Sequence, residues 1–360
     1  MRILLNMMKY DYGDPKQGLS FEYEVFGSVL KRIKDIEIEL FDYGQEMKEK
    51  GQKEMNRELI GRCKKFRPDL IFTFLFEKEI YPDTFKEIKN YSKASITWMA
   101  DDKWRWEIFG SKYCNNFDYV ITTDPDALGK YKSIGYKNAI LSQWAVDPAV
   151  YMKKDINKDI DVSFVGRANP WRKYVVKELL KEGINVECYG FDWGNGRVTQ
   201  EEMVDIFNRS KINLNLSNSV KFNLKYLLDI NLSWDSDKSL IKNIYSVFGS
   251  QINTIISKKR KEDIKARFFE VIGCGGFLLS YNVEFLNDYF TLDRELVIYE
   301  DTTDLAKKIE YYLNNDSERE KIASNGYERV KKEHTYEKRL TEIFKRMARK
   351  DKVFDNISFK

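Results

Sequence analysis

Short apolar runs rich in β-branched and aromatic residues alternate along the chain with longer stretches of helical spacing. This alternation predicts parallel strands joined by crossover helices, because strands buried on both faces of a sheet have continuous apolar sequences. The predicted strands of the first half are residues 3–7, 36–41, 70–75, 95–99, 119–122 and 139–141. A helix is expected at 21–33 between the first two strands, with Ser20 as its N-cap.

The second half repeats this pattern after a polar stretch at 153–161, which is interpreted as a linker. Its predicted strands are 161–165, 185–189, 212–216, 276–280 and 296–299, and its predicted helices are 171–182, 200–209, 264–273 and 303–313. The charged end, about 317–350, has helical spacing of its apolar residues. An α/β chain of two Rossmann-like, doubly wound units is therefore expected.

The expected domains are an N-terminal unit at 1–152 and a C-terminal unit at 153–335. Residues 336–360 are expected to form a helix and tail that pack back on the N-terminal unit. The segment 222–260 is too long for a strand-to-helix connection and is interpreted as an insertion. Because doubly wound sheets bind ligands outside the carboxyl ends of their strands, two such units should face each other across a ligand-binding cleft.

Composition narrows the chemistry. The 61 Lys and Arg against 57 Asp and Glu give a net charge of only +4, which argues against a dedicated nucleic-acid binder. The single histidine, His334, excludes a His-rich metal site and is interpreted as a structural residue at a helix junction. The four cysteines form no CxxC pair, which favours a reduced, cytoplasmic chain.

Features of a membrane or secreted protein are not expected. Residues 1–6 lead directly into a strand-like run in place of a signal peptide. No 18 apolar residues run together, so a transmembrane segment is not predicted, while peripheral membrane contact stays open.

The most informative segment is 264–280, a predicted helix that ends in glycines and continues into a buried strand. Glu270 lies among apolar neighbours in that helix, where a carboxylate is costly unless it is bound. It could accept hydrogen bonds from two neighbouring hydroxyls, as on a ribose, and Arg267 one turn earlier could contact a phosphate. On spacing alone, a purely structural Glu270–Arg267 ion pair is slightly favoured over this role.

A second motif lies at 162–173, where a predicted strand ends at Gly166 and a helix begins near Pro170. Backbone N–H groups at such a junction attract a phosphate, and Arg167, Arg172 and Lys173 add positive charge. The alternative, basic residues on an exposed helix, is less favoured because the loop follows a strand of the second unit.

Two further places in the first unit are candidate sites. The loop 12–20 carries Gly13 and Gly18 but lacks G-x-G-x-x-G, which argues against an NAD or FAD enzyme. Asp101 and Asp102 follow a predicted strand, where a carboxylate could bind an acceptor hydroxyl or act as a base. Capping of the next helix is an equal alternative for them.

Two other sequence patterns, the D-x-D triplets and the tryptophans, are weaker evidence for a functional site. Three D-x-D triplets (124–126, 159–161 and 235–237) are too scattered to indicate a metal site, and no metal is expected. Four tryptophans could stack on sugars, although ordinary packing is the more common role of such residues: Trp104, Trp106, Trp171 and Trp193.

The segment 264–280, together with 296–305 and 322–335, closely resembles the CgeB-type (spore maturation protein) glycosyltransferases. These belong to the GT-B superfamily, related to glycosyltransferase family four. The first half resembles them mainly at 96–102 and 118–123. The resemblance implies a GT-B fold and transfer of a sugar from a nucleotide-sugar donor. It makes residues 153–335 the nucleotide-sugar-binding unit and residues 1–152 the acceptor-side unit.

The resemblance also assigns roles to residues. Glu262-x7-Glu270 fits the E-x7-E donor motif, in which Glu270 holds the ribose and Glu262 faces the donor sugar. Arg167-x5-Lys173 matches a recurrent Gly-Arg…Lys spacing. The expected catalytic residues are Arg167, Lys173, Asp101, Asp102 and Glu262. The expected donor-binding residues are Glu270, Arg267, Gly166, Arg172, Gly190, Asn215, Gly13 and Gly18.

The expected reaction is hexosyl transfer from a UDP-type donor to an unknown acceptor (a glycan, lipid, protein or small molecule). Retention of configuration is implied by the resemblance. Metal independence is expected because Arg, Lys and a helix N-terminus can stabilise the leaving diphosphate. Two alternatives stay open, a nucleotide-sugar epimerase-type GT-B enzyme and a non-catalytic structural or coat-associated protein of the same fold. A nucleic-acid acceptor is not favoured.

Overall fold

A computed structural model of the chain describes residues 1–216, 262–349, 354–355 and 357. The predicted insertion at 222–260 lies outside the described residues. The chain divides into two compact units, unit 1 (Met1–Asp147 with His334–Lys360) and unit 2 (Pro148–Glu333). The chain first passes from unit 1 to unit 2 between residues 147 and 148, a few residues before the expected boundary at 152/153.

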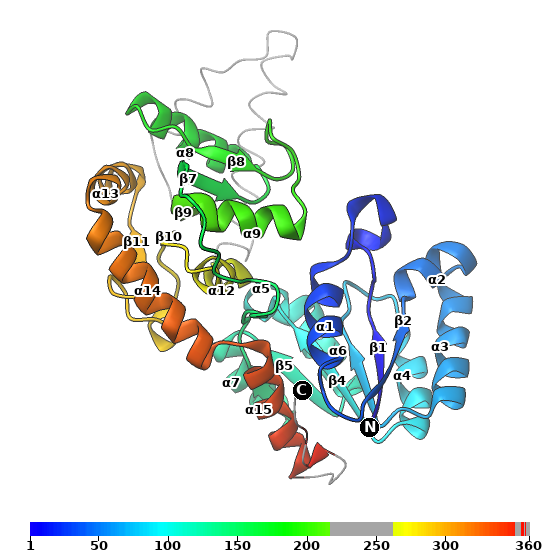
Figure 1. Ribbon diagram of the computed structural model, residues 1–360. Helices are drawn as coiled ribbons and strands as arrows, with labels where there is room; N and C mark the ends of the chain where they lie inside the picture. The colour runs from blue at the N-terminus through cyan, green and yellow to red at the C-terminus, as the bar shows by residue number, and fades with distance from the viewer. Residues whose placement is uncertain (217–261, 350–353, 356, 358–360) are drawn as a thin grey trace. The chain divides into compact units, whose positions relative to one another are not determined.

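Unit 1 is built on a six-stranded parallel sheet of order β2-β1-β3-β4-β5-β6 (Figure 1). Its strands lie where the apolar runs predict them: β1 (Arg2–Asn6), β2 (Glu37–Phe41), β3 (Leu70–Thr73), β4 (Ala94–Met99), β5 (Tyr119–Thr122) and β6 (Ala139–Leu141). Strands β3, β4 and β5 are buried along their whole length, which explains their continuous apolar sequences.

The connections of unit 1 are mostly short helices. The α-helices are α1 (Ser28–Leu30), α2 (Tyr43–Lys50), α3 (Gln52–Phe66), α4 (Pro82–Ile88), α5 (Asp102–Arg105), α6 (Ser111–Tyr113), α7 (Pro125–Ser133) and α15 (Tyr336–Ala348). Four 3₁₀ turns are η1 (Asp11–Gly13), η2 (Pro15–Gln17), η4 (Lys89–Tyr91) and η6 (Cys114–Asn116), and two π turns are η3 (Tyr23–Gly27) and η5 (Trp106–Gly110).

The helix predicted at 21–33 is correct in place but contains the π turn η3 before α1. Ser20 caps it as predicted, because the Ser20 hydroxyl accepts the Tyr23 backbone N–H at 3.2 Å.

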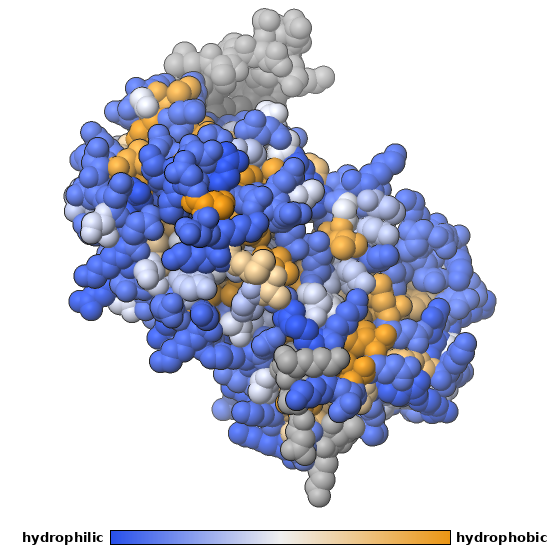
Figure 2. Space-filling view, viewed as in Figure 1, coloured by the Kyte–Doolittle hydropathy of each residue, from blue (hydrophilic) through white to orange (hydrophobic). Residues whose placement is uncertain are grey.

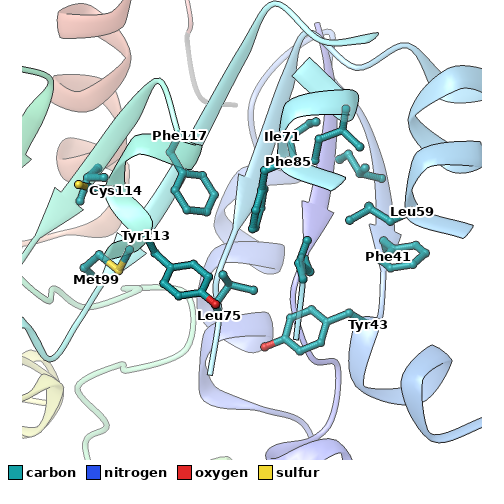
Figure 3. Close-up of a cluster of buried hydrophobic side chains, with 14 of the residues drawn as sticks. Phe41, Tyr43, Leu59, Ile71, Leu75, Phe85, Met99, Tyr113, Cys114 and Phe117 are labelled. Carbon is teal, nitrogen blue, oxygen red and sulfur yellow. The ribbon is translucent and has the colours of Figure 1, made fainter. Parts of the chain in front are cut away.

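Buried aromatic and aliphatic side chains fill the core of unit 1 (Figure 3). The rings of Phe85 and Phe117 meet edge to face with centroids 4.8 Å apart, and Trp98 stacks on Trp144 at 5.6 Å. The chain's 14% share of aromatic residues is thus used largely in packing.

The C-terminal helix α15 is part of unit 1. Buried Tyr336 packs against Phe26 with ring centroids 5.7 Å apart. Arg32 bridges two carboxylates, at 2.8 Å from Asp147 and 3.1 Å from Glu337. These contacts join the two ends of unit 1, which are far apart in the sequence.

Unit 2 contains a five-stranded parallel sheet of order β11-β10-β9-β7-β8. Its strands are β7 (Ile160–Val165), β8 (Glu187–Tyr189), β9 (Ser210–Asn215), β10 (Leu278–Tyr281) and β11 (Val297–Tyr299). Its helices are α8 (Pro170–Lys181), α9 (Gln200–Arg209), α12 (Ala266–Gly273), α13 (Thr302–Asn314) and α14 (Asp316–Glu333), with the 3₁₀ turn η8 (Leu286–Asp288). Each element predicted within the described part of this half is present.

The polar stretch at 153–161 is part of unit 2, so its interpretation as a linker between the units is wrong. The Lys154 backbone N–H donates to Asn208 Oδ1 at 2.6 Å, and the end of the stretch enters β7. Hydrophilic residues cover most of the face shown in Figure 2, with hydrophobic residues scattered between them. Among the described residues, no helix is both long and apolar enough to cross a bilayer.

Candidate functional site

The predicted site residues divide between the units. Those of unit 2 lie near the carboxyl ends of its strands, on α8 or around α12: Gly166, Arg167, Arg172, Lys173, Gly190, Asn215, Glu262, Arg267 and Glu270. Those of unit 1 are Gly13, Gly18, Asp101 and Asp102. The carboxyl ends of the strands are where doubly wound sheets bind ligands, so each unit carries its candidates at the appropriate edge.

The loop 166–169, which joins β7 to α8, is held by the loop after β8. The Gly166 N–H donates to the Tyr189 carbonyl and the Ala168 N–H to the Phe191 carbonyl, both at 2.8 Å. The indole N–H of Trp193 donates to the Gly166 carbonyl at 2.9 Å. These bonds set the backbone of the loop before any ligand is present.

Gly190 allows this close approach of the two loops. Its φ is +127°, and a Cβ at this position would lie 2.4 Å from the Gly166 carbonyl oxygen. A side chain is therefore excluded by both the conformation and the available space.

Exposed positive charge surrounds the start of α8. Asn169 caps the helix by accepting the Arg172 N–H at 2.8 Å, and Pro170 occupies the first turn. The Arg167 side chain is 69% exposed and lies 3.6 Å from Asp192, and Lys173 is also exposed. A helix N-terminus flanked by cations is a favourable place for an anion.

Arg172 has a different environment from the other two basic residues of the motif. Its buried guanidinium donates to the Leu216 carbonyl at 3.0 and 2.7 Å and to the Arg167 carbonyl at 2.8 Å. Burial lowers the pKa of Arg172, against the opposing charges of Tyr281 and Glu262. The side chain thus links the loop 166–169 to the end of β9 and lies within electrostatic range of Glu262.

Glu270 is buried in α12 and has two partners. Its Oε1 accepts the Tyr151 hydroxyl at 2.9 Å, and its Oε2 lies 2.8 Å from Arg267 Nη1. The Glu270–Arg267 pair that the spacing left open is therefore present. Burial and the Glu270 carboxylate raise the pKa of Tyr151 well above its usual value.

Tyr151 was missed by the sequence reasoning, because its position beside the polar stretch gives no sign of a partner so far away along the chain. Only the folding of this stretch onto α12 shows the contact.

Asn215 lies at the end of β9, where its side chain and backbone are both used. Its Nδ2 donates to Ser280 Oγ at 3.1 Å, and its carbonyl accepts the Tyr299 hydroxyl at 3.3 Å. These bonds join the ends of β9, β10 and β11.

In unit 1, Asp102 is buried at the start of α5 and accepts the Tyr131 hydroxyl at 2.8 Å. Burial raises the pKa of Asp102 to about 7. Half-buried Asp101 precedes it, and its carbonyl accepts the Arg105 N–H at 2.8 Å. Gly13 and Gly18, at φ +68° and +78°, turn the loop after β1.

Sequence reasoning also missed Glu22, which follows the loop after β1. Burial first, and then the charges of Asp11 and Asp101, raise the pKa of Glu22 to about 7. Asp11 and Glu22 lie in the connection after β1, and Asp101 lies in the connection after β4. Their helical or loop sequences contain no motif that would join them.

The other candidate patterns have local partners. Asp124 caps α7, while Asp159 and Asp161 pair with Arg209 and Lys211. The triplet 235–237 lies outside the described residues, and the remainder contains no group of three or more His, Cys, Asp or Glu arranged to hold a metal. The four tryptophans are half-buried; Trp106 meets Tyr131, and Trp171 stacks on Tyr174.

Comparison with known proteins agrees with this architecture. Residues 171–345 match a family described as glycosyl transferase-like. The Bacillus subtilis (strain 168) spore protein CgeB is 18% identical over 286 residues, covering 78% of this chain and 83% of that protein.

Two solved structures have similar folds. Anabaena Alr3699/HepE in complex with UDP-glucose has a TM-score of 0.62 at 10% identity, covering 97% of this chain and 100% of that one. Sucrose-phosphate synthase from Thermosynechococcus elongatus has a TM-score of 0.59 at 12% identity, covering 97% and 98%. At these identities the likeness concerns the fold, and it confirms the expected GT-B fold of two Rossmann-like units. The family match over residues 171–345 and the shared fold make this chain similar to glycosyltransferases.

Proposed function

We propose that the protein transfers a sugar from a UDP-type nucleotide-sugar donor, bound by unit 2, to an acceptor. The observation that carries the proposal is the loop 166–169, a preformed turn at the N-terminus of α8 with the exposed cations Arg167 and Lys173. A diphosphate is the part of such a donor that this combination of backbone N–H groups and positive charge fits. The UDP-glucose bound by the HepE neighbour supports a uridine nucleotide.

In this proposal, the leaving diphosphate is stabilised by the protein's own cations. Glycosyl transfer passes through an oxocarbenium-like state in which negative charge develops on the leaving group. Arg167, Lys173 and the α8 N-terminus stabilise that charge, and no metal is required. Retention of configuration follows from the resemblance to CgeB-type enzymes and is part of the same proposal.

Glu270 is proposed to accept hydrogen bonds from the ribose hydroxyls. Each carboxylate oxygen can accept more than one bond, so its bonds to Tyr151 and Arg267 orient the group without exhausting it. Glu262 is proposed to face the donor sugar, with buried Arg172 as its electrostatic partner.

Donor binding is tested first, by thermal shift of the whole chain with UDP, GDP, ADP and CMP. We expect UDP to raise the melting temperature most, because a ligand at a hundred times its Kd stabilises by about 2.7 kcal/mol. Equal or absent shifts for all four nucleotides would contradict the donor assignment.

Turnover is tested with UDP-glucose in excess EDTA, with released UDP and the anomeric configuration of the product as readouts. Arg167→Ala should raise the donor KM by about ten- to a hundredfold, the effect of losing a charge-assisted hydrogen bond. Arg209→Ala is the matched control, because Arg209 also pairs with an exposed aspartate, Asp159, but the pair lies at the amino ends of β9 and β7. Activity that is lost in EDTA and restored by a divalent ion would refute the metal-free mechanism.

A further inference from the structure

Unit 1 presents two exposed aromatic rings in contact with each other. Tyr12 is 64% exposed and Phe76 is 45% exposed, and their rings meet edge to face with centroids 5.3 Å apart. Single exposed hydrophobic residues are common on protein surfaces, but this pair comes from two different loops. We call Tyr12 and Phe76 the aromatic platform.

The platform lies where a ligand is expected on this sheet. Tyr12 follows β1 and Phe76 follows β3, and these strands are neighbours in the order β2-β1-β3-β4-β5-β6. From β1 the chain passes to β2, toward one edge of the sheet, and from β3 it passes to β4, toward the other edge. This reversal makes their carboxyl ends the crevice at which doubly wound sheets bind ligands.

Hydrogen bonds hold the backbone that carries both rings. The Phe76 carbonyl accepts Arg105 Nη2 at 2.6 Å, and its N–H donates to the buried hydroxyl of Tyr43 at 3.2 Å. Tyr12 has φ +51°, a left-handed conformation that is unfavourable for a bulky side chain. The loop that carries it is closed by the Asp11 N–H, which donates to the Gly18 carbonyl at 3.0 Å. A strained residue thus keeps its ring in solvent beside a second exposed ring, whose backbone is hydrogen-bonded on both sides.

Acidic and basic side chains both lie around the platform, so neither sign of charge dominates there. Asp11 adjoins Tyr12, and Asp11 and Asp101 both act on Glu22. Carboxylates accept hydrogen bonds from sugar hydroxyls, while Arg105, at the Phe76 carbonyl, and exposed Lys78 can donate to hydroxyl oxygens. Aromatic faces together with carboxylates match the apolar C–H face and the hydroxyl rim of a pyranose.

We infer that the aromatic platform binds an uncharged saccharide, with Tyr12 and Phe76 against the sugar ring and nearby carboxylates accepting its hydroxyls. The inference rests on the proposed function, since it makes the acceptor of the transfer a glycan. It narrows the acceptor class from lipid, protein, glycan or small molecule to carbohydrate.

The test is ligand-observed saturation-transfer NMR on the full chain with maltose, cellobiose and lactose as probes, and with UDP as an independent probe. At least one disaccharide should receive saturation, strongest at its ring C–H protons. The signal should fall about tenfold in Tyr12→Asn and in Phe76→Ala. Asparagine tolerates a left-handed backbone, so Tyr12→Asn removes the ring without disturbing the loop.

Tyr311→Ala is the matched control, an exposed tyrosine of unit 2 that should leave the saccharide signal unchanged. Thermal unfolding of each variant verifies the fold. Saccharide binding that is absent from the wild type, or equal in wild type and both platform variants, overturns the inference. The UDP signal reports separately on the proposed function, because all of these variants lie outside the loop 166–169 that is proposed to bind the diphosphate.

Discussion

Asp102 should make the stability of unit 1 depend on pH in a way that a single substitution removes. Its side chain is buried, and burial raises its pKa from 3.8 to about 7. Hydrogen bonds from Thr122 and Tyr131 lower this pKa and offset only part of the rise that burial causes. Below about pH 4 the carboxyl is protonated in both the folded and the unfolded chain, so it contributes no pH dependence there.

Between about pH 4 and pH 7 the unfolded chain releases the proton while the folded chain keeps it. Folding stability therefore falls as the pH rises through this window and becomes level above the folded pKa. Each pH unit is equivalent to about 1.36 kcal/mol, so the whole window corresponds to a loss of about 4 kcal/mol. This loss is a large part of the typical free energy of unfolding of a domain, which is roughly 5–15 kcal/mol.

The assay is urea unfolding of wild type and Asp102→Asn across about pH 4 to pH 8, followed by tryptophan fluorescence. Asparagine cannot ionise and its oxygen can still accept the Tyr131 hydroxyl, so the variant should gain stability relative to wild type as the pH rises. Tyr131→Phe removes one bond that lowers the Asp102 pKa and should extend the window to higher pH. If the free energy of unfolding changes with pH in the same way in wild type and in Asp102→Asn, this reasoning is refuted.

Three further outcomes are expected. Gly190→Ala should destabilise unit 2 by about 3 kcal/mol in chemical unfolding, because its Cβ meets the Gly166 carbonyl at a positive φ. Gly194→Ala, with nothing within 4 Å, should change little. Arg172→Met should cost about 3 kcal/mol, because it leaves the Leu216 and Arg167 carbonyls without their donor, whereas exposed Lys173→Met should stay within about 0.5 kcal/mol. The four cysteines are buried and burial raises their pKa values, to about 12 for Cys63 and Cys188. A thiol reagent near pH 8 should therefore modify them rapidly only in denaturant, and rapid native labelling would contradict this.

The strands could be predicted from the sequence because a parallel sheet buried on both faces requires continuous apolar runs. The segments Tyr119–Thr122 and Ala139–Leu141 are observed at the predicted residues. Helix ends with a clear cap were also predictable, as at Ser20. The π turns η3 and η5 were not, since their residues keep helical spacing and differ only in backbone hydrogen bonding.

The site was only partly predictable, because residue type does not show whether a side chain is buried or exposed. Arg167, Arg172 and Lys173 are equivalent basic residues in the sequence. In the structure the first and third are exposed, while Arg172 binds two carbonyls in the interior. The Tyr151 hydroxyl on Glu270 depends on a contact between distant segments.

Local patterning by itself determined the α/β class, the two parallel sheets and the turns at which candidate residues stand, because these follow from periodicity and from glycine and proline chemistry. Only the tertiary structure decided which candidates share a carboxyl edge, which charges are satisfied internally and which aromatic rings reach solvent. Those properties depend on burial and on partners from remote parts of the chain. They raise the pKa of Asp102, hold the loop 166–169 against Gly190 and leave Tyr12 beside Phe76.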